Sequence, residues 1–210
     1  MATKSRRARG RFRALLADLE AWVKDSVAPP PSVYPHIADG QLTDLAGLRF
    51  PAIAATPQHP RVARRLDFGP EFDSRGVILQ EPPKVTGAFP VLVPQVDADG
   101  IDLGGVRLPE LAVPVATITG WNLRARERGA PSELAEYYGS IFPLAGNKDA
   151  RASTHDPRPA IAERYASFEE YKQRVTAAAD ELVRRRLVLP EDRDYVVEHA
   201  ARLWQAVAHY

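Results

Sequence analysis

The sequence predicts a mixed α+β fold, with a helix near its N-terminal end, an irregular antiparallel β region in the middle and helices toward its C-terminal end. Two observations carry this prediction. Apolar residues recur at helical spacing between residues 12 and 23 and again beyond residue 167. The region from about residue 29 to residue 120 holds 14 of the 19 prolines between short apolar runs, which is typical of strands and extended loops. A length of 210 residues is sufficient for one buried core.

The first predicted element is a helix over residues 12–28, preceded by a flexible basic arm over residues 1–11. Six basic residues from Lys4 to Arg13 come before the first acid, Asp18, and a solvated terminus is the favoured interpretation. Three consecutive prolines from Pro29 end the helix. We expect residues 12–210 to form a single domain. One face of the helix predicted over residues 12–28 is apolar, and it consists of Phe12, Leu15, Leu16, Leu19, Trp22 and Val23.

Residues 29–125 are predicted to form the irregular β region. The segment from Val91 to Pro109 is typical of a hairpin, with Asp99 and Gly100 as the two central residues of a type I′ turn. Prolines within the apolar runs remove ladder donors, so these strands are expected at sheet edges. The apolar runs are residues 45–50, 77–79, 89–96, 101–108 and 111–118.

Residues 130–210 are predicted to be helical. A short helix is expected to open at Pro131-Ser132-Glu133 and to close at Gly139. Ser167 and Glu170 have the spacing of a capping box at the start of a long helix. Pro190, followed by two acids, predicts the start of the last helix.

Composition and charge limit the classes of function. The formal net charge is +1, so nucleic-acid binding is not expected, although the basic arm could contact phosphates. There is no cysteine, which excludes disulfides and thiol chemistry. No apolar run is long enough to span a membrane, and a cytoplasmic location is expected. Whether the first ten residues are native is left open.

No complete catalytic or metal motif appears in the sequence. The pentapeptide G-x-S-x-G of α/β hydrolases is absent. Ser140, Ser153 and His155 are weak catalytic candidates, since an Asp adjacent to His155 cannot normally orient the same imidazole. The five histidines form no H-x-x-x-H pair, and the acids around Gly100 lack the distal glutamate of a calcium loop. We therefore expect no metal and no cofactor.

Two groups of residues are candidates for ligand binding. Trp121, Asn122 and Arg124 place an apolar ring beside polar groups at the end of a β run, which suits a ligand pocket or the closure of a core. Asp156 and Arg158 belong to a second segment, DPRPAIAERY, that is dense in acids and arginines. Its arginine–carboxylate pairs could tie the loop to the following helix or form an anion pocket, and the structural role is favoured.

Several sequence blocks resemble one family. The blocks follow one another from Leu15 to Tyr165, and the likeness covers about residues 12–195: LLADLEAWV, PPPSVYPHIADGQL, FPAI, LVPQVDADGIDLGGVRLPELAVPVATITGWNLR, GAPSELAEYYGS and DPRPAIAERY. Their order and spacing resemble the C-terminal part of bacterial alpha/beta hydrolase domain proteins. One detail departs from the family, because Ala160 stands where a serine is expected.

The resemblance implies a hydrolase fold whose catalytic serine and histidine lie upstream of the part that matches residues 12–23. No catalytic residue is therefore carried over to this chain. The leading hypothesis is an accessory or remnant C-terminal domain without turnover by itself, such as a family tail or a truncated gene. It would self-associate or bind a hydrolase partner domain through helix 12–23, which should then expose apolar surface. The alternative is a small divergent serine esterase that acts on a carboxylic ester.

Overall fold

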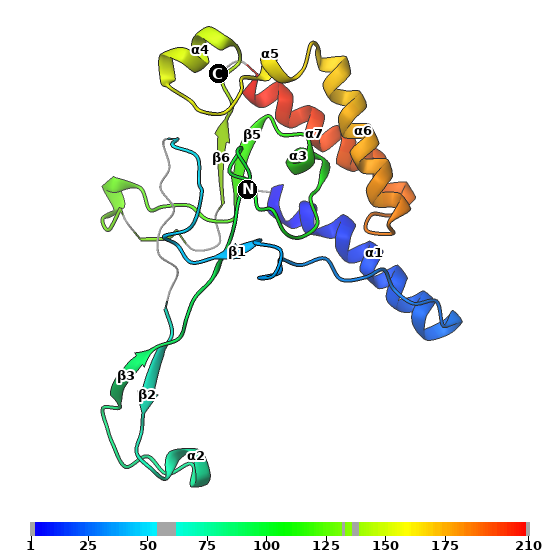
Figure 1. Cartoon of the computed structure of the whole chain (residues 1–210). Helices are drawn as coiled ribbons and strands as arrows, with labels where there is room; N and C mark the ends of the chain where they lie inside the picture. Colours follow the sequence, from blue (N-terminus) through cyan, green and yellow to red (C-terminus); the bar gives the residue numbers. More distant parts are fainter. Residues whose placement is uncertain (1–2, 54–61, 132, 136–138, 209–210) are drawn as a thin grey trace.

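The structure is a computed structural model that describes residues 3–53, 62–131, 133–135 and 139–208. A helical layer packs beside a short sheet, and a hairpin arm projects from the rest of the molecule (Figure 1). The fold is mixed α+β, as the sequence predicts. The helices of the layer are α3 (Pro109–Ala112), α6 (Phe168–Arg184) and α7 (Arg193–Val207), with α1 (Thr3–Asp25) alongside them.

The core lies between α6, α7 and α3. Ser167 caps α6 by accepting a hydrogen bond from the Glu170 amide at 3.2 Å, and the Glu170 carboxylate accepts one from the Ala166 amide at 2.7 Å. This arrangement is close to the predicted capping box. The 3₁₀ turn η2 (Pro190–Asp192) leads into α7 at the predicted place. The buried apolar faces of the two long helices contribute Tyr171, Val175, Ala179, Leu182, Val196, Val197, Ala200, Leu203 and Val207.

Aromatic rings fill the end of this core. The rings of Tyr165, Phe168 and Trp204 surround Tyr171, and the Tyr171–Trp204 centroids are 4.7 Å apart. The Tyr171 hydroxyl donates to the Ala200 carbonyl at 3.0 Å, and the Tyr165 hydroxyl donates to the Pro114 carbonyl at 2.9 Å. Burial raises the pKa of Tyr165 to about 12 and also raises the pKa of Tyr171. Both phenols therefore remain hydrogen-bond donors at every ordinary pH.

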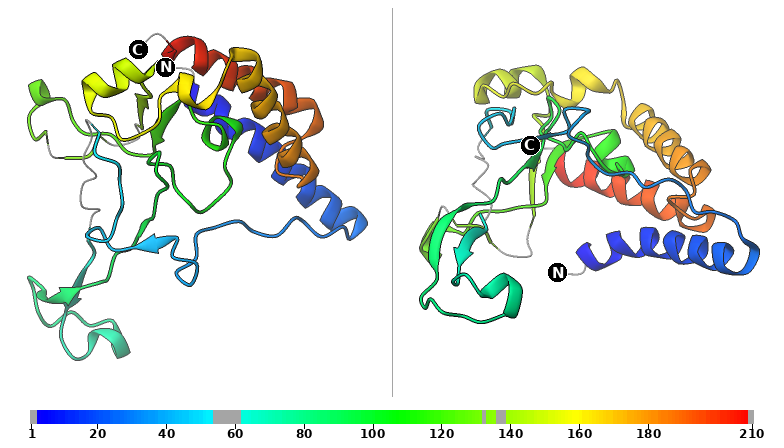
Figure 2. Two further views of the ribbon diagram at one scale, coloured as in Figure 1. Left: turned by 45° about the horizontal axis from the view of Figure 1, so that its top comes forward. Right: turned by 60° about the horizontal axis from the view of Figure 1, so that its bottom comes forward.

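Helix α1 lies against the body with its charged side inward. Asp18 is buried and accepts hydrogen bonds from Arg186, in the turn after α6, and Arg13 pairs with Asp192 before α7. The two further views in Figure 2 show α1 running beside α7. The apolar stripe is left in solvent, with 51–75% of each residue exposed: Phe12, Leu15, Leu16, Leu19, Trp22 and Val23.

The start of α1 differs from the sequence prediction. The helix begins at Thr3, so residues 3–11 are helical, where a flexible arm was expected. It ends at Asp25 and not at residue 28. Arginine and alanine are good helix formers, and they extend the helix beyond its apolar stripe.

The middle region forms short strands in pairs. Strand β1 (Leu42–Thr43) pairs with β4 (Val93–Pro94), and both are two residues long. Strand β5 (Ala116–Thr119) pairs antiparallel with β6 (Ser140–Pro143) and carries the buried face of the sheet. The irregular antiparallel character is as predicted, because prolines interrupt the runs.

The turn at Gly100 is of another type than predicted. Gly100 has a φ of 74°, whereas Ala98 and Asp99 are not among the described residues with positive φ. The Gly100 amide donates to the Asp97 carbonyl, and the Asp97 amide donates to the Ile101 carbonyl. This is a type I turn followed by a left-handed glycine, the usual three-residue hairpin loop. The expected hairpin is reduced to the bridge between Val96 and Asp102.

The helix expected from Pro131 to Gly139 is not supported by the described residues, and Ser132 and residues 136–138 lie outside them. Leu134 forms a β-bridge with Leu123, and the Arg124 amide donates to the Glu133 carbonyl. The cross-strand contact takes precedence over the local helix signal here. Among the described residues, the prediction of a helical region from residue 130 is wrong before residue 148, because β6 comes first. Helical structure begins with α4 (Lys148–Thr154) and α5 (Ile161–Arg164), while the 3₁₀ turn η1 (Arg126–Arg128) lies before Leu134.

The projecting arm consists of β2 (Arg64–Asp67), α2 (Phe72–Arg75) and β3 (Lys84–Ala88). The two strands pair antiparallel, and all nine strand residues are exposed. In Figure 1 the arm extends away from the helical layer. The apolar run at residues 77–79 lies in the arm tip outside both strands, and β2 and β3 were not predicted.

Candidate functional site

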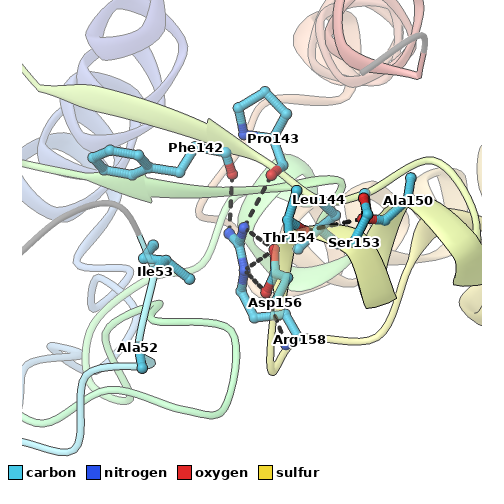
Figure 3. A pocket seen from close by; sticks show the side chains of 11 residues that line it. Ala52, Ile53, Phe142, Pro143, Leu144, Ala150, Ser153, Thr154, Asp156 and Arg158 are labelled. Atoms are coloured by element: carbon cyan, nitrogen blue, oxygen red, sulfur yellow. Dashed lines mark hydrogen bonds and ion pairs between the residues drawn. The ribbon is translucent and has the colours of Figure 1, made fainter.

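A hollow of about 470 Å³ lies between the end of β6, helix α4 and residues 52–53. Its volume is within the range of small-molecule pockets. Figure 3 shows how its lining side chains are arranged around Arg158. The apolar part of the lining is Ala52, Ile53, Phe142, Pro143, Leu144, Ala145 and Ala150, and the polar part is Ser153, Thr154, Asp156 and Arg158.

Arg158 is the central polar residue of the hollow, and only 3% of its side chain is exposed. Its Nη1 donates to the Thr117 hydroxyl at 2.7 Å and to the Phe142 carbonyl at 3.0 Å. Its Nη2 donates to the Pro143 carbonyl at 3.0 Å and to Asp156 Oδ2 at 2.6 Å, and its Nε donates to Asp156 Oδ1 at 2.9 Å. These bonds engage all five guanidinium N–H groups.

Asp156 is matched to Arg158 as a charge partner. Burial raises the pKa of the Asp156 carboxyl. Hydrogen bonds from Arg158 and its positive charge lower this pKa by more, so it lies below its ordinary value. The carboxylate also accepts from the Arg158 backbone amide at 2.9 Å. The pair is therefore charged and mutually neutralised at neutral pH. With its N–H groups engaged, the guanidinium leaves none directed at an incoming anion.

The same network ties distant parts of the chain together. The Thr117 hydroxyl donates to the Asp99 carbonyl in the Gly100 turn, and Arg164 pairs with the Asp99 carboxylate. Arg151 pairs with Glu163 at 2.9 Å across the loop between α4 and α5. The structural role that the sequence favoured for the DPRPAIAERY arginines is visible in these pairs. Thr117 was not a candidate, because nothing in its local sequence indicates a partner 41 residues away.

The catalytic candidates lie in two places. The Ser153 hydroxyl donates to the Ala150 carbonyl at 2.8 Å, as expected of a serine inside a helix. His155 ends α4 with a φ of 55° and is exposed, and it is not among the described residues that line the hollow. Ser140 starts β6, and its hydroxyl donates to the Trp121 carbonyl at 3.2 Å. A catalytic role for any of the three stays a prediction.

Of the other ligand candidates, Trp121 lines a second hollow of about 250 Å³ together with Phe50 and Leu134, whereas Asn122 and Arg124 are not among its described lining residues. The Trp121 and Phe50 rings are 5.7 Å apart. The Asn122 side chain accepts from the Leu123 amide at 2.8 Å, and exposed Arg124 donates to the Arg128 carbonyl. The structure thus separates Trp121, Asn122 and Arg124 from the Asp156–Arg158 pair. Ligand binding at either place stays a prediction.

The acids around Gly100 also have protein partners. Asp97 accepts from the amides of Asp99 and Ile101, and it pairs with Arg107 at 2.9 Å. Among the described residues there is no group of three or more His, Asp or Glu side chains that could hold a metal ion. Within the same residues, no helix is both long enough and apolar enough to cross a membrane.

The fold and the site define a mixed α+β protein with a small, mainly apolar hollow whose lining includes a buried ion pair. The model of one family, described as alpha/beta hydrolase domain, matches residues 2–198. The match covers most of the chain, so the chain belongs to this family. It confirms the resemblance of the sequence blocks to the alpha/beta hydrolase domain family. No curated protein and no solved structure matches the chain.

Proposed function

We propose that the chain acts as an accessory or remnant domain of an alpha/beta-hydrolase-type protein. It has no turnover by itself and binds a hydrolase partner domain through the α1 stripe. The observation that carries the proposal is the exposure of this stripe, from 51% at Leu19 to 75% at Val23. Such a continuous apolar face is typical of an interaction site.

The total exposed area supports a missing partner. The chain exposes 13881 Å², whereas a compact monomer of 23.2 kDa exposes roughly 9,700 Å². This excess on one chain is larger than one partner's share of an obligate interface, because such interfaces bury about 2,000–5,000 Å² summed over both partners. The chain therefore has more surface than one self-sufficient domain of its mass.

The sheets support the same proposal. In the described ranges the named strands form three separate two-stranded sheets. A hydrolase nucleophile stands on a sharp turn between a strand and a helix of one central sheet. Ser140 and Ser153 instead donate to backbone carbonyls. An accessory layer fits this arrangement better than a catalytic sheet does.

One observation favours the alternative, a small serine esterase acting on a carboxylic ester. Ser153 lines the apolar hollow and lies two residues from His155. The hollow has a neutralised ion pair and several apolar walls, and it would suit a neutral acyl or alcohol group. This alternative makes the chain catalytic by itself, which separates it from the accessory domain.

Leu16→Glu is expected to reduce the fluorescence of bound anilinonaphthalene sulfonate, a probe of apolar surface, because Leu16 is 65% exposed in the stripe. The free energy of unfolding should change by less than about 0.5 kcal/mol, as for other surface substitutions. The matched control is Ala17→Glu, which adds the same charge at the next exposed residue outside the stripe. A wild-type chain that binds no probe, or equal binding by both variants, would contradict an exposed docking face.

A further inference from the structure

The projecting arm is a second surface: among the described strands, β2 and β3 pair only with each other. All nine residues of β2 and β3 are exposed. An isolated two-stranded hairpin is marginally stable in water, and three or more strands are normally needed. The arm therefore has a physical reason to add strands from outside.

The two edges of the arm are not equivalent. The pairing shifts between Arg65 and Leu66, and Thr86 is the extra residue on β3. A bulge twists a strand and disfavours further pairing at its edge. Strand β2 is regular and contains no proline. Its outer edge is thus the better template for another strand.

The backbone alternation of β2 fixes which groups face outward. The Phe89 amide donates to the Ala63 carbonyl, so residues 63 and 65 direct their backbone groups toward β3. The N–H and C=O groups of Arg64 and Leu66 then face away from β3. An antiparallel strand can pair with β2 only in a register that places such outward residues opposite each other.

The β2 sequence is self-complementary in one of these registers. If Leu66 lies opposite Leu66 of a second copy, each Arg65 lies opposite the other copy's Asp67. Two ion pairs then flank one apolar pair across a twofold axis. The register shifted by one pair would place Arg65 opposite Arg65, which is unfavourable. Charge therefore selects the register centred on Leu66.

The two ends of the arm also match in this arrangement. Apolar side chains are exposed at the tip, where Phe72, Ile78 and Leu79 are 38–59% exposed. Others are exposed at the base, where Val62, Phe89 and Leu92 are 42–50% exposed. Antiparallel arms bring the tip of one copy beside the base of the other. We propose that the arm, residues 62–92, pairs β2 against β2 with a second copy of this chain and forms a four-stranded antiparallel sheet.

Charge-swap complementation tests this pairing in the full chain by sedimentation equilibrium. Arg65→Glu places acids opposite acids at both crossings, and Asp67→Arg places bases opposite bases. We expect the dimer Kd of each variant alone to rise by on the order of tenfold or more, because two exposed pairs change from attraction to repulsion. An equimolar mixture of the two variants should regain the wild-type Kd, since every crossing is again complementary.

Two controls keep the result specific. Asp39→Arg makes the same charge change in an exposed turn away from the arm and should leave the Kd unchanged. Leu16→Glu removes the α1 stripe and should also leave arm pairing intact, so failure of the arm and failure of the α1 proposal can be told apart. A wild-type chain that stays monomeric at its solubility limit would overturn the arm proposal. Wild-type affinity in both charge variants, or a mixture that does not recover, would overturn it as well.

Discussion

Replacing Arg158 by alanine is expected to lower the free energy of unfolding by about 3–5 kcal/mol, the loss typical of breaking a buried ion pair. The substitution leaves the Asp156 carboxylate, 11% exposed, without its charge partner. It also removes donors from the Phe142 and Pro143 carbonyls and from the Thr117 hydroxyl. Chemical denaturation monitored by circular dichroism measures the change.

The matched control is Arg184→Ala, since Arg184 is 74% exposed and pairs with Glu181 on the surface of α6. The free energy of unfolding of this variant should fall by less than about 1 kcal/mol, as for exposed ion pairs. An equal loss of unfolding free energy in the two variants would show that the bonds of Arg158 do not stabilise the loop more than an exposed ion pair does.

Truncating Tyr171 to alanine is expected to lower the free energy of unfolding by about 3–5 kcal/mol. The ring is fully buried among three other aromatic rings, and the surrounding side chains can fill the resulting cavity only in part. Tyr171→Phe keeps the ring and removes only the hydroxyl that donates to the Ala200 carbonyl. That variant should lose about 1 kcal/mol. The two variants thus separate packing from hydrogen bonding in the same denaturation assay.

Tyr34→Ala serves as the control for ring removal, because Tyr34 is 56% exposed beside His36. The free energy of unfolding of Tyr34→Ala should fall by less than about 1 kcal/mol. If Tyr171→Phe proves as damaging as Tyr171→Ala, the hydroxyl and not the ring holds α6 to α7.

Local signals predicted the helical parts of the fold well. The spacing of apolar residues placed α6 and α7, and Ser167 and Pro190 marked where they begin. The same spacing identified the stripe on α1, and the structure confirms that it is exposed. Periodicity cannot tell which side of a helix faces the body, and here the buried side holds Ala14 and the charged residue Asp18.

The predictions that were wrong or missing concern segments whose structure depends on contacts between distant residues. The helix signal at Pro131 is overridden by the bridge of Leu134 to Leu123. Strand β2 is short and mostly charged, and β3 contains a glycine and has no buried face, so neither stands out from loops. Arg158 itself bonds to residues up to 41 positions away, so only its Asp156 partner could be seen locally. The dense DPRPAIAERY segment indicated ion pairs but not which strand they would hold.

We propose a domain that supports a hydrolase partner and does not perform the reaction itself. The most direct measurement is hydrolysis of a panel of short and medium acyl esters by the purified chain. A serine-reactive phosphonate and mass spectrometry would locate any adduct. We predict no turnover and no labelled serine. Turnover with an adduct on Ser153 or Ser140, abolished by His155→Ala, would contradict the account and establish a self-contained esterase.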